Sequence, residues 1–406
     1  MTTDTSEKGL ETLIMRHMTG EDGLAVTPNR VAERPPPCGG TGYTAGSAKD
    51  YDRAYALDVP QVFAFLRATQ PEAFKKLALA DAGDSKGINR LKFLARLSAE
   101  IGKRGVIDVL RKGVDHGPVH FDLFYGTPSP GNAKAEALHA LNRFSITRQL
   151  GYSMDETRRA LDLGLFINGL PIATFELKNS LTKQTVEDAV EQYKRDRDPR
   201  ERLFDFGRCV VHFAVDDSEV QMCTELAGKR SWFLPFNKGY NDGAGNPPNP
   251  YGLKPDYLWK EVLTTAGLTN ILENYAQIVE EKDPRTGRKK RKQVWPRYHQ
   301  LGVVRQALPD PALGGQRQVE LHRMARTPAY WTEVRRQGGL RLGHRGHRPA
   351  PPRRSDPDHH QAVHAGGRDG GSRRAVRRPA QIHRGGEEDH RLDGAEVSLH
   401  PRRNRH

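Results

Sequence analysis

Apolar residues recur at helical spacing through the first part of the chain. The segment KGLETLIMRH, residues 8–17, places apolar side chains three and four positions apart, and Ser6 precedes it as a candidate N-cap. A loop rich in Pro and Gly follows at 33–47, and Gly87 and Gly105 interrupt the later helical patterns. The spacing predicts helices over 59–69, 72–81, 89–103 and 106–113.

The middle of the chain is typical of strands. Aromatic and branched residues fill short runs, and the pair Asn168-Gly169 between two such runs predicts a tight hairpin. Strands alternating with helices predict an α/β fold, with a mixed central sheet flanked by helices. The predicted strands are 120–125, 144–150, 160–167, 172–178 and 209–215, and the predicted helices lie near 131–142, 183–197 and 266–280.

Composition changes sharply near Leu308. The 406 residues carry a net charge of +14, and residues 310–406 hold 20 Arg, 11 acidic residues, no Lys and no Phe. That tail accounts for +9 of the charge and leaves +5 for residues 1–309. Because the tail lacks the apolar residues of a core, we expect it to be disordered and basic.

Composition also narrows the class of protein. No apolar run approaches the roughly 18–20 residues that span a bilayer, and the polar, acidic N-terminus does not have the layout of a secretory leader. Cys38, Cys209 and Cys223 form no CxxC pair, so neither a disulfide framework nor a zinc ribbon is indicated. We expect a cytoplasmic protein without a membrane partner, and the positive charge favours a polyanion such as nucleic acid.

The predicted hairpin carries the most specific chemistry. Asp162 lies in its first strand, and Glu176 and Lys178 lie two positions apart in its second, which places them on one face. Two carboxylates suit Mg²⁺, which lowers the pKa of a bound water and neutralises charge at phosphorus. A lysine beside them orients that water or stabilises developing negative charge. The set therefore indicates phosphodiester hydrolysis.

The register of the hairpin decides whether these residues meet. If Asn168-Gly169 is a strict two-residue loop, Asp162 faces Phe175 and points away from Glu176. A three-residue loop or one bulge would place Asp162 opposite Glu176 on a shared face. We predict that slip or bulge.

Structural explanations compete with the functional ones. An E-x-K is common in a chain with 28% charged residues, and Lys178 could form a plain salt bridge with either carboxylate. The run RKKRK at 288–292, followed by Trp295 and Tyr298, mixes cations with aromatic residues as nucleic-acid grooves do. A solvated linker explains that run equally well.

Several segments together resemble a known family. ALDLGLFINGLPIATFELKN, DAVEQYKRDRDP, VHFAVDD, FLPFNKG and GAGNPPNP, with the opening SEKGLETLI, resemble the N-terminal region of the restriction (R) subunit of type I restriction-modification enzymes over residues 6–308. The resemblance implies a PD-(D/E)xK nuclease core with metal ligands at Asp162 and Glu176 and the catalytic lysine at Lys178. It also implies supporting roles for Gln192 and, where the family spacing departs, Tyr193.

The resemblance implies a larger assembly as well. The family cleaves double-stranded DNA, associates with methylation and specificity subunits, and continues into ATP-driven motor domains. WPRYHQLGVVRQAL resembles the lead-in to the first motor, with Gln300 as an adenine-contacting glutamine. After Leu308 the motor is replaced by the Arg-rich tail, and a shift of one nucleotide allows 310–329 to encode a peptide containing GSGKS, the core of a nucleotide-binding loop.

The expected organisation has three parts. Residues 1–280 form a nuclease domain, helical over about 1–115 and with its catalytic α/β core at about 116–240; residues 281–308 are a basic linker and lead-in; residues 309–406 are an out-of-frame, disordered tail. We expect a Mg²⁺-dependent DNA endonuclease fragment that does not bind ATP. A DNA-binding module without catalysis and an inactive pseudogene product are the alternatives.

Overall fold

The computed structural model describes residues 7–23, 40–79, 87–155, 159–282 and 286–307. All of them belong to one compact unit, Met1–Arg341, and the second unit, Leu342–His406, lies outside the described residues. The predicted disordered tail and its shifted reading frame therefore also fall outside them. Within the described residues, no helix combines the length and apolarity needed to cross a membrane.

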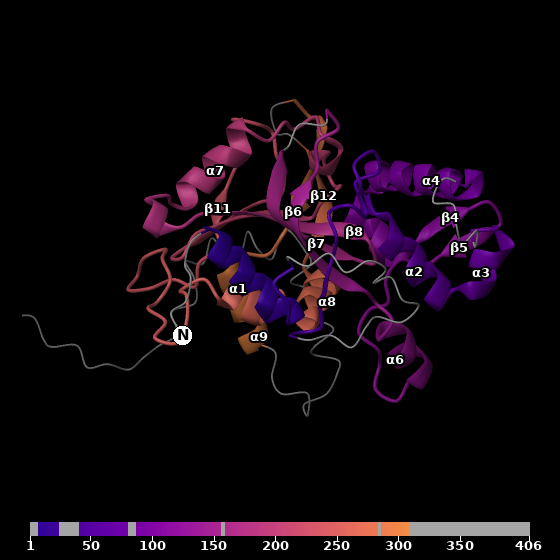
Figure 1. Ribbon diagram of the computed structural model, residues 1–406, viewed down its shortest axis with the longest axis horizontal. Coiled ribbons are helices and arrows are strands. Elements are labelled where there is room, and N and C mark those ends of the chain that lie inside the picture. Colours follow the sequence, from indigo (N-terminus) through magenta and orange to yellow (C-terminus); the bar gives the residue numbers. More distant parts are fainter. Residues whose placement is uncertain (1–6, 24–39, 80–86, 156–158, 283–285, 308–406) are drawn as a thin grey trace, which may run out of the picture. The chain divides into compact units, whose positions relative to one another are not determined.

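A mixed sheet forms the centre of the described part, as the sequence predicts (Figure 1). Its seven strands follow the order β1-β6-β7-β8-β9-β10-β11, with β1 parallel to β6, β8 parallel to β9, and the other neighbours antiparallel. The strands are β1 (Thr44–Ala45), β6 (Phe144–Gly151), β7 (Ala160–Ile167), β8 (Leu170–Leu177), β9 (Val211–Val215), β10 (Val220–Cys223) and β11 (Leu234–Pro235).

Helices cover both faces of this sheet (Figure 1). The helix α7 (Val186–Arg195) packs on one face, against β8, β9 and β10, and α1 (Glu7–Thr19) packs on the other. The remaining α-helices are α2 (Val59–Thr69), α3 (Pro71–Lys76), α4 (Ile88–Arg104), α5 (Val106–Lys112), α6 (Ala133–His139), α8 (Thr265–Asn274) and α9 (Tyr298–Ala307), and a π-helix spans Leu258–Val262.

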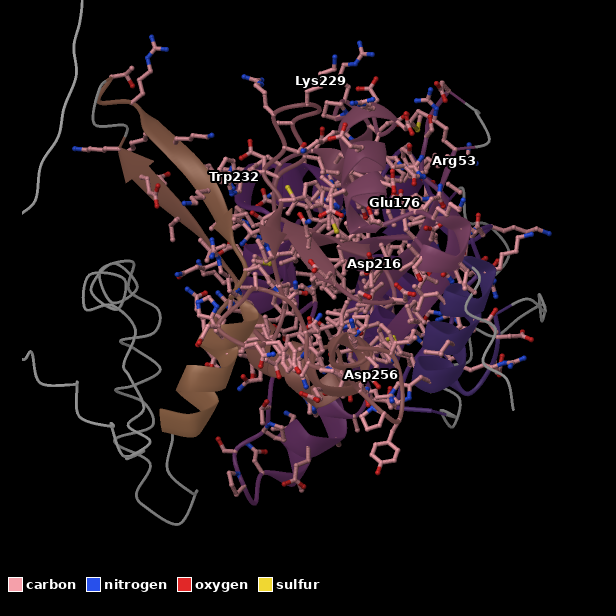
Figure 2. The ribbon with its side chains drawn as sticks, turned by 90° about the vertical axis from the view of Figure 1, so that its left-hand side faces the viewer. Arg53, Glu176, Asp216, Lys229, Trp232 and Asp256 are labelled. Atoms are coloured by element: carbon pink, nitrogen blue, oxygen red, sulfur yellow. The ribbon has the colours of Figure 1, made fainter. Side chains whose placement is uncertain are left out.

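Small two-stranded sheets surround the central one. They pair β2 (Tyr51–Asp52) with β3 (Leu57–Asp58), β4 (Val114–His116) with β5 (Val119–Phe121), and β12 (Gln277–Lys282) with β13 (Lys289–Val294). In Figure 2 the β12–β13 hairpin stands out from the body of the molecule, at the upper left. The segment predicted as a basic linker and lead-in, 281–308, thus includes the end of β12, all of β13 and the helix α9.

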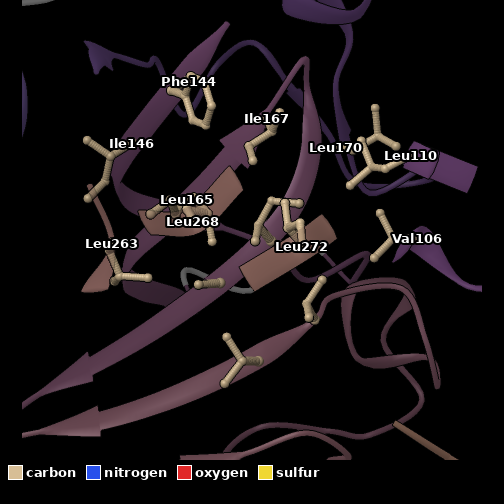
Figure 3. Packing of buried hydrophobic residues seen from close by; sticks show 14 of the residues in the cluster. Val106, Leu110, Phe144, Ile146, Leu165, Ile167, Leu170, Leu263, Leu268 and Leu272 are labelled. Carbon is tan, nitrogen blue, oxygen red and sulfur yellow. The ribbon is translucent and has the colours of Figure 1, made fainter. Parts of the chain in front are cut away.

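The larger core lies on the α1 face of the sheet. Leucine, isoleucine and phenylalanine side chains from β6, β7 and β8 meet those of α5 and α8 there (Figure 3). Alternate positions of the strands point to the opposite face, where a second cluster includes Phe166 of β7, Ala214 of β9 and Tyr193 of α7. The polar side chains of Thr174, Glu176 and His212 lie on this second face, beside Tyr193.

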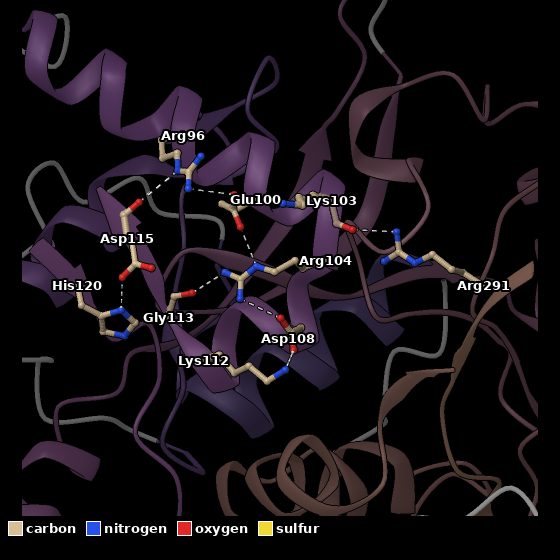
Figure 4. Close-up of polar contacts among 10 residues, drawn as sticks. All are labelled: Arg96, Glu100, Lys103, Arg104, Asp108, Lys112, Gly113, Asp115, His120 and Arg291. Atoms are coloured by element: carbon tan, nitrogen blue, oxygen red, sulfur yellow. Dashed lines mark hydrogen bonds and ion pairs between the residues drawn. The ribbon is translucent and has the colours of Figure 1, made fainter. Parts of the chain in front are cut away.

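Salt bridges and carbonyl contacts fix the helix junctions. Arg104, at the end of α4, binds Glu100 at 2.8 Å, Asp108 of α5 at 2.9 Å and the Gly113 carbonyl at 2.6 Å (Figure 4). Arg111 of α5 donates from Nε to the Leu272 carbonyl and from Nη2 to the Ala276 carbonyl, both at 2.7 Å. These bonds satisfy carbonyls at the end of α8, so the chain leaves the helix there and enters β12, rather than continuing as the predicted helix to residue 280.

Most predicted elements form, with shifted ends. The helix predicted over 59–69 is α2, whose N-cap Asp58 accepts a hydrogen bond from the Gln61 amide at 3.2 Å. The strand predicted over 120–125 is shorter, because β5 ends at Phe121. The short strands β10 and β11, the last two in the order of the sheet, were not predicted.

Candidate functional site

The site is built on the β7–β8 hairpin. Its turn residues both have positive φ, 51° at Asn168 and 80° at Gly169, as a two-residue hairpin turn requires. The Asn168 side chain accepts from the Arg143 amide at 2.7 Å and donates to the Leu123 carbonyl at 2.9 Å. The turn is therefore fixed by its surroundings as well as by its sequence.

A bulge separates this turn from the site. Next to the turn, Phe166 pairs with Pro171, but the next pair along is Leu165 with Ala173, so β8 contains one extra residue at Ile172. Pro171 has no backbone N–H to give to the ladder, which favours a bulge at this position. The predicted bulge is confirmed, and the shifted register continues to the pair Leu163 and Phe175.

This register brings the predicted carboxylates together. The register of Leu163 with Phe175, extended by one residue, aligns Asp162 with Glu176, and the Asp162 charge acts on the Glu176 carboxyl group. The Asp162 Oδ2 accepts a hydrogen bond from the Leu177 amide at 2.7 Å. Glu176 is completely buried, and Lys178, directly after β8, is 7% exposed. The three residues D…E-x-K thus lie in one cluster at the ends of two adjacent strands.

Arg197 is part of this cluster, although the sequence did not suggest it. Its Nε donates to Glu176 Oε1 at 2.6 Å, and its Nη2 donates to the Ala160 carbonyl at 3.0 Å. The guanidinium also lies 5.5 Å from the ring centre of Tyr152, whose hydroxyl is 3.4 Å from Nη1. Glu176 Oε1 is therefore occupied, whereas the buried Oε2 has no hydrogen-bond partner among the described residues.

The buried setting changes the acidity of Glu176. Burial raises the pKa of its carboxyl group to about 8, because the charged form loses its hydration. The Arg197 hydrogen bond lowers this pKa, the Asp162 charge raises it, and the Lys178 charge lowers it. A cation placed against Oε2 would favour the ionised form.

The two residues of α7 that the resemblance implies as supporting, Tyr193 and Gln192, occupy different environments. Tyr193 is fully buried, and its hydroxyl is 2.9 Å from Thr174 Oγ1, which in turn lies 2.7 Å from Nδ1 of His212. The Glu176 charge contributes, after burial, to raising the pKa of Tyr193, so the two side chains are neighbours. Gln192 is half-buried, and its side chain makes no hydrogen bond within the described part of the chain.

The start of α7 is held beside the same strands. Asp216, just after β9, accepts from the Val186 amide at 2.9 Å through Oδ2. Its Oδ1 accepts from the amides of Ser218 at 2.7 Å and Glu219 at 2.6 Å. One carboxylate thus fixes both the helix N-terminus and the turn after β9.

Gln300, the predicted adenine contact, lies elsewhere. It belongs to α9, where its Oε1 accepts from the Arg297 amide at 2.8 Å. This bond caps the first turn of its own helix. Binding of ATP remains a prediction about the intact family.

The donor set has the chemistry that Mg²⁺ requires. Across the described ranges, no group of three or more His, Cys, Asp or Glu residues is arranged as a metal cage. Mg²⁺ is commonly held by one or two carboxylates, with water and phosphate oxygens completing its shell. Asp162 and the partnerless Oε2 of Glu176 fit that minimal arrangement.

The fold and cluster define an α/β protein with a carboxylate pair and a lysine at the ends of adjacent strands. Residues 72–231, which include β7, β8, α7 and β9, match the family described as the type I restriction enzyme R protein N terminus. This match supports an R-subunit N-terminal region and a restriction-modification context. No curated protein sequence gives a significant match to the chain.

Proposed function

We propose that the chain is the DNA-cleaving part of a type I restriction enzyme R subunit, an endonuclease that hydrolyses phosphodiesters of double-stranded DNA with Mg²⁺. One observation carries the proposal: the β8 bulge puts Asp162 opposite Glu176, whose Oε2 is buried and without a partner. Burying such an oxygen costs free energy unless it gains a ligand.

Each residue has a defined role in this mechanism. Asp162 and Glu176 would hold the ion, which when bound supplies a water of lowered pKa and positive charge near the phosphorus. Arg197 keeps Oε1 engaged, so that Oε2 is the oxygen of Glu176 left for the ion. Lys178 places an ammonium group beside the carboxylates, where it orients the attacking water or stabilises charge on the phosphate.

The other subunits and domains in this proposal are inferred from the family alone. Methylation and specificity subunits would supply site recognition, and the motor domains of the family would supply ATP hydrolysis. The described residues would then contribute cleavage alone. We expect their hydrolysis of DNA to be slow, dependent on Mg²⁺ and independent of ATP.

Plasmid nicking tests the function. The full chain should convert supercoiled DNA to open circles with Mg²⁺ but not with EDTA, and Asp162→Asn and Glu176→Gln should each abolish this activity. Asp115→Asn and Glu191→Gln change the same groups at partly exposed or exposed positions and should leave it intact. Equal nicking by Asp162→Asn and the wild type would refute the assignment.

Metal binding provides a readout separate from activity. Calorimetric titration with Mn²⁺, a Mg²⁺ substitute, should show binding to the wild type and a loss in Asp162→Asn. A wild type that binds duplex DNA but neither takes up metal nor nicks the plasmid would favour the non-catalytic DNA-binding module.

A further inference from the structure

The β12–β13 hairpin concentrates the positive charge of the folded part. Six consecutive pairs, from Gln277 with Val294 to Lys282 with Lys289, make it a regular two-stranded ribbon. Residues 277–294 contain seven basic and three acidic residues, a net charge of +4. Residues 1–309 as a whole carry +5, so the hairpin holds a charge nearly equal to that total.

Only part of this charge is neutralised within the hairpin. Lys289 lies 3.0 Å from Glu280, and Lys292 lies 3.9 Å from Glu281, but all four side chains are more than half exposed. Such exposed pairs add little stability, and salt screens them.

Two other cations of the hairpin have no counter-ion among the described residues. Lys290 and Arg288 are exposed and form no ion pair with any residue the structure describes. Lys282 stands directly opposite Lys289, an arrangement that is unfavourable for two like charges. The excess charge at this end of the hairpin is therefore available to an anionic partner.

The base of the hairpin is fixed firmly to the central sheet. The buried Gln293 side chain donates from Nε2 to the carbonyls of Cys209 and Val210, both at 2.8 Å. Trp295, directly after β13, is 3% exposed and packs edge-on against Phe213 of β9. Since Phe213 stacks on Phe175 of β8, the hairpin is connected through packed rings to the strand that carries Glu176.

Arg291 adds a second anchor. It donates to the Lys103 carbonyl of α4 at 2.9 Å (Figure 4), and its guanidinium lies 5.3 Å from the ring centre of Phe206. The aromatic residues Trp295 and Tyr298 belong to the packed interior, so they are not a stacking surface for bases. The exposed chemistry of the hairpin is cationic.

We propose that this hairpin is a phosphate-binding element that grips the backbone of double-stranded DNA. Its exposed cations Lys289, Lys290 and Lys292 lie within about 10 Å of strand, a length over which a duplex presents about six phosphates. A two-stranded ribbon also has the width that the major groove admits. The choice of DNA as the polyanion rests on the proposed function, whereas the affinity for phosphates rests on the hairpin alone.

Salt-dependent binding tests the proposal. The variant Arg288→Gln/Lys290→Gln/Lys292→Gln removes three exposed charges and leaves the anchors Arg291 and Gln293 in place. Fluorescence anisotropy with a duplex of about 30 base pairs, in EDTA, should show binding weakened by about tenfold or more at 0.1 M salt. The slope of log affinity against log salt should fall by up to about 3.

A control with the same change in charge separates the hairpin from bulk electrostatics. Lys75→Gln/Lys76→Gln/Lys92→Gln removes three exposed charges from α3 and α4 and should retain the wild-type slope. Residues 310–406, with their net +9, are present in every variant and contribute equally. Equal slopes for the hairpin and control variants would overturn the proposal, as would tighter binding of duplex RNA or polyglutamate than of duplex DNA.

Different results would refute the hairpin proposal and the proposed nuclease function. Binding that depends on the hairpin without any nicking of plasmid would contradict the proposed function and retain the hairpin assignment. Nicking that depends on Mg²⁺, together with equal DNA affinities for the hairpin variant and the control variant, would retain the proposed function and contradict the hairpin assignment. Thermal melts of all variants establish that each is folded.

Discussion

Removing Arg197 should expose the energetic cost of the buried carboxylate. The substitution Arg197→Met keeps an extended apolar side chain but deletes the guanidinium that contacts Glu176 Oε1 at 2.6 Å. Both partners are buried, with side chains 6% and 0% exposed. Taking away one partner of such a pair costs about 3–5 kcal/mol, because the other charge remains without compensation.

The dependence on pH identifies the source of that cost. Glu176 has a folded pKa raised to about 8 against its ordinary 4.5, so between these values the folded state binds more protons than the unfolded state. The contribution of Glu176 to the free energy of unfolding is therefore complete at pH values below its unfolded pKa. It is lost as the pH rises towards the folded pKa, by at most about 1.4 kcal/mol per pH unit. Because Arg197 lowers this pKa, Arg197→Met should extend the loss to higher pH.

Urea unfolding measures the effect. The buried Trp259 and Trp295 should shift their fluorescence to longer wavelength on unfolding. At a pH of about 8.5, Arg197→Met should lower the free energy of unfolding by about 3–5 kcal/mol. Adding Glu176→Gln should recover much of this loss and remove the pH dependence that comes from Glu176. The exposed pair of Arg195 and Glu191 supplies the control Arg195→Met, expected to change stability by less than about 1 kcal/mol. A loss below about 1 kcal/mol for Arg197→Met would refute the buried-pair argument.

Three further variants test the supports of the site. Gly169→Ala should destabilise the protein by about 1–3 kcal/mol in urea unfolding, because φ is +80° and the new methyl carbon would lie 2.4 Å from the Asp58 carbonyl oxygen. Burial lowers the pKa of His212 to about 3, so wild-type stability should fall as pH drops below 6.5, and the same titration with His212→Gln should lose this component. Asp216→Ala leaves three amides without their acceptor and should cost about 1–3 kcal/mol, with faster hydrogen exchange at the start of α7.

Local patterns were enough to predict the elements that carry the site. Asn168-Gly169 specified the turn, and the apolar runs on either side specified β7 and β8. The bulge followed from a chemical requirement, since only a shifted register allows Asp162 to meet Glu176. The sequence could not say which residue would be extra, although Pro171 in retrospect indicates that position.

Local sequence patterns could not predict contacts between residues that are far apart in the chain. Arg197 is 21 positions after Glu176, in a segment of alternating charges where no arginine stands out. The β12–β13 hairpin was hidden for a different reason: its strands carry charged residues on both faces, so the alternation of apolar and polar positions that marks a strand is weak. Its stability comes from the buried base at Gln293 and Trp295, which only the folded chain reveals.

The extra residue in β8 has a consequence for comparing this chain with others. Turn length and bulge together determine whether the two carboxylates share a face, so one can substitute for the other. A relative with a three-residue turn in place of Asn168-Gly169 would need no counterpart of Ile172. Correctly aligned, the two chains would show an insertion and a deletion a few positions apart, and an alignment without gaps would shift the segment between them by one residue.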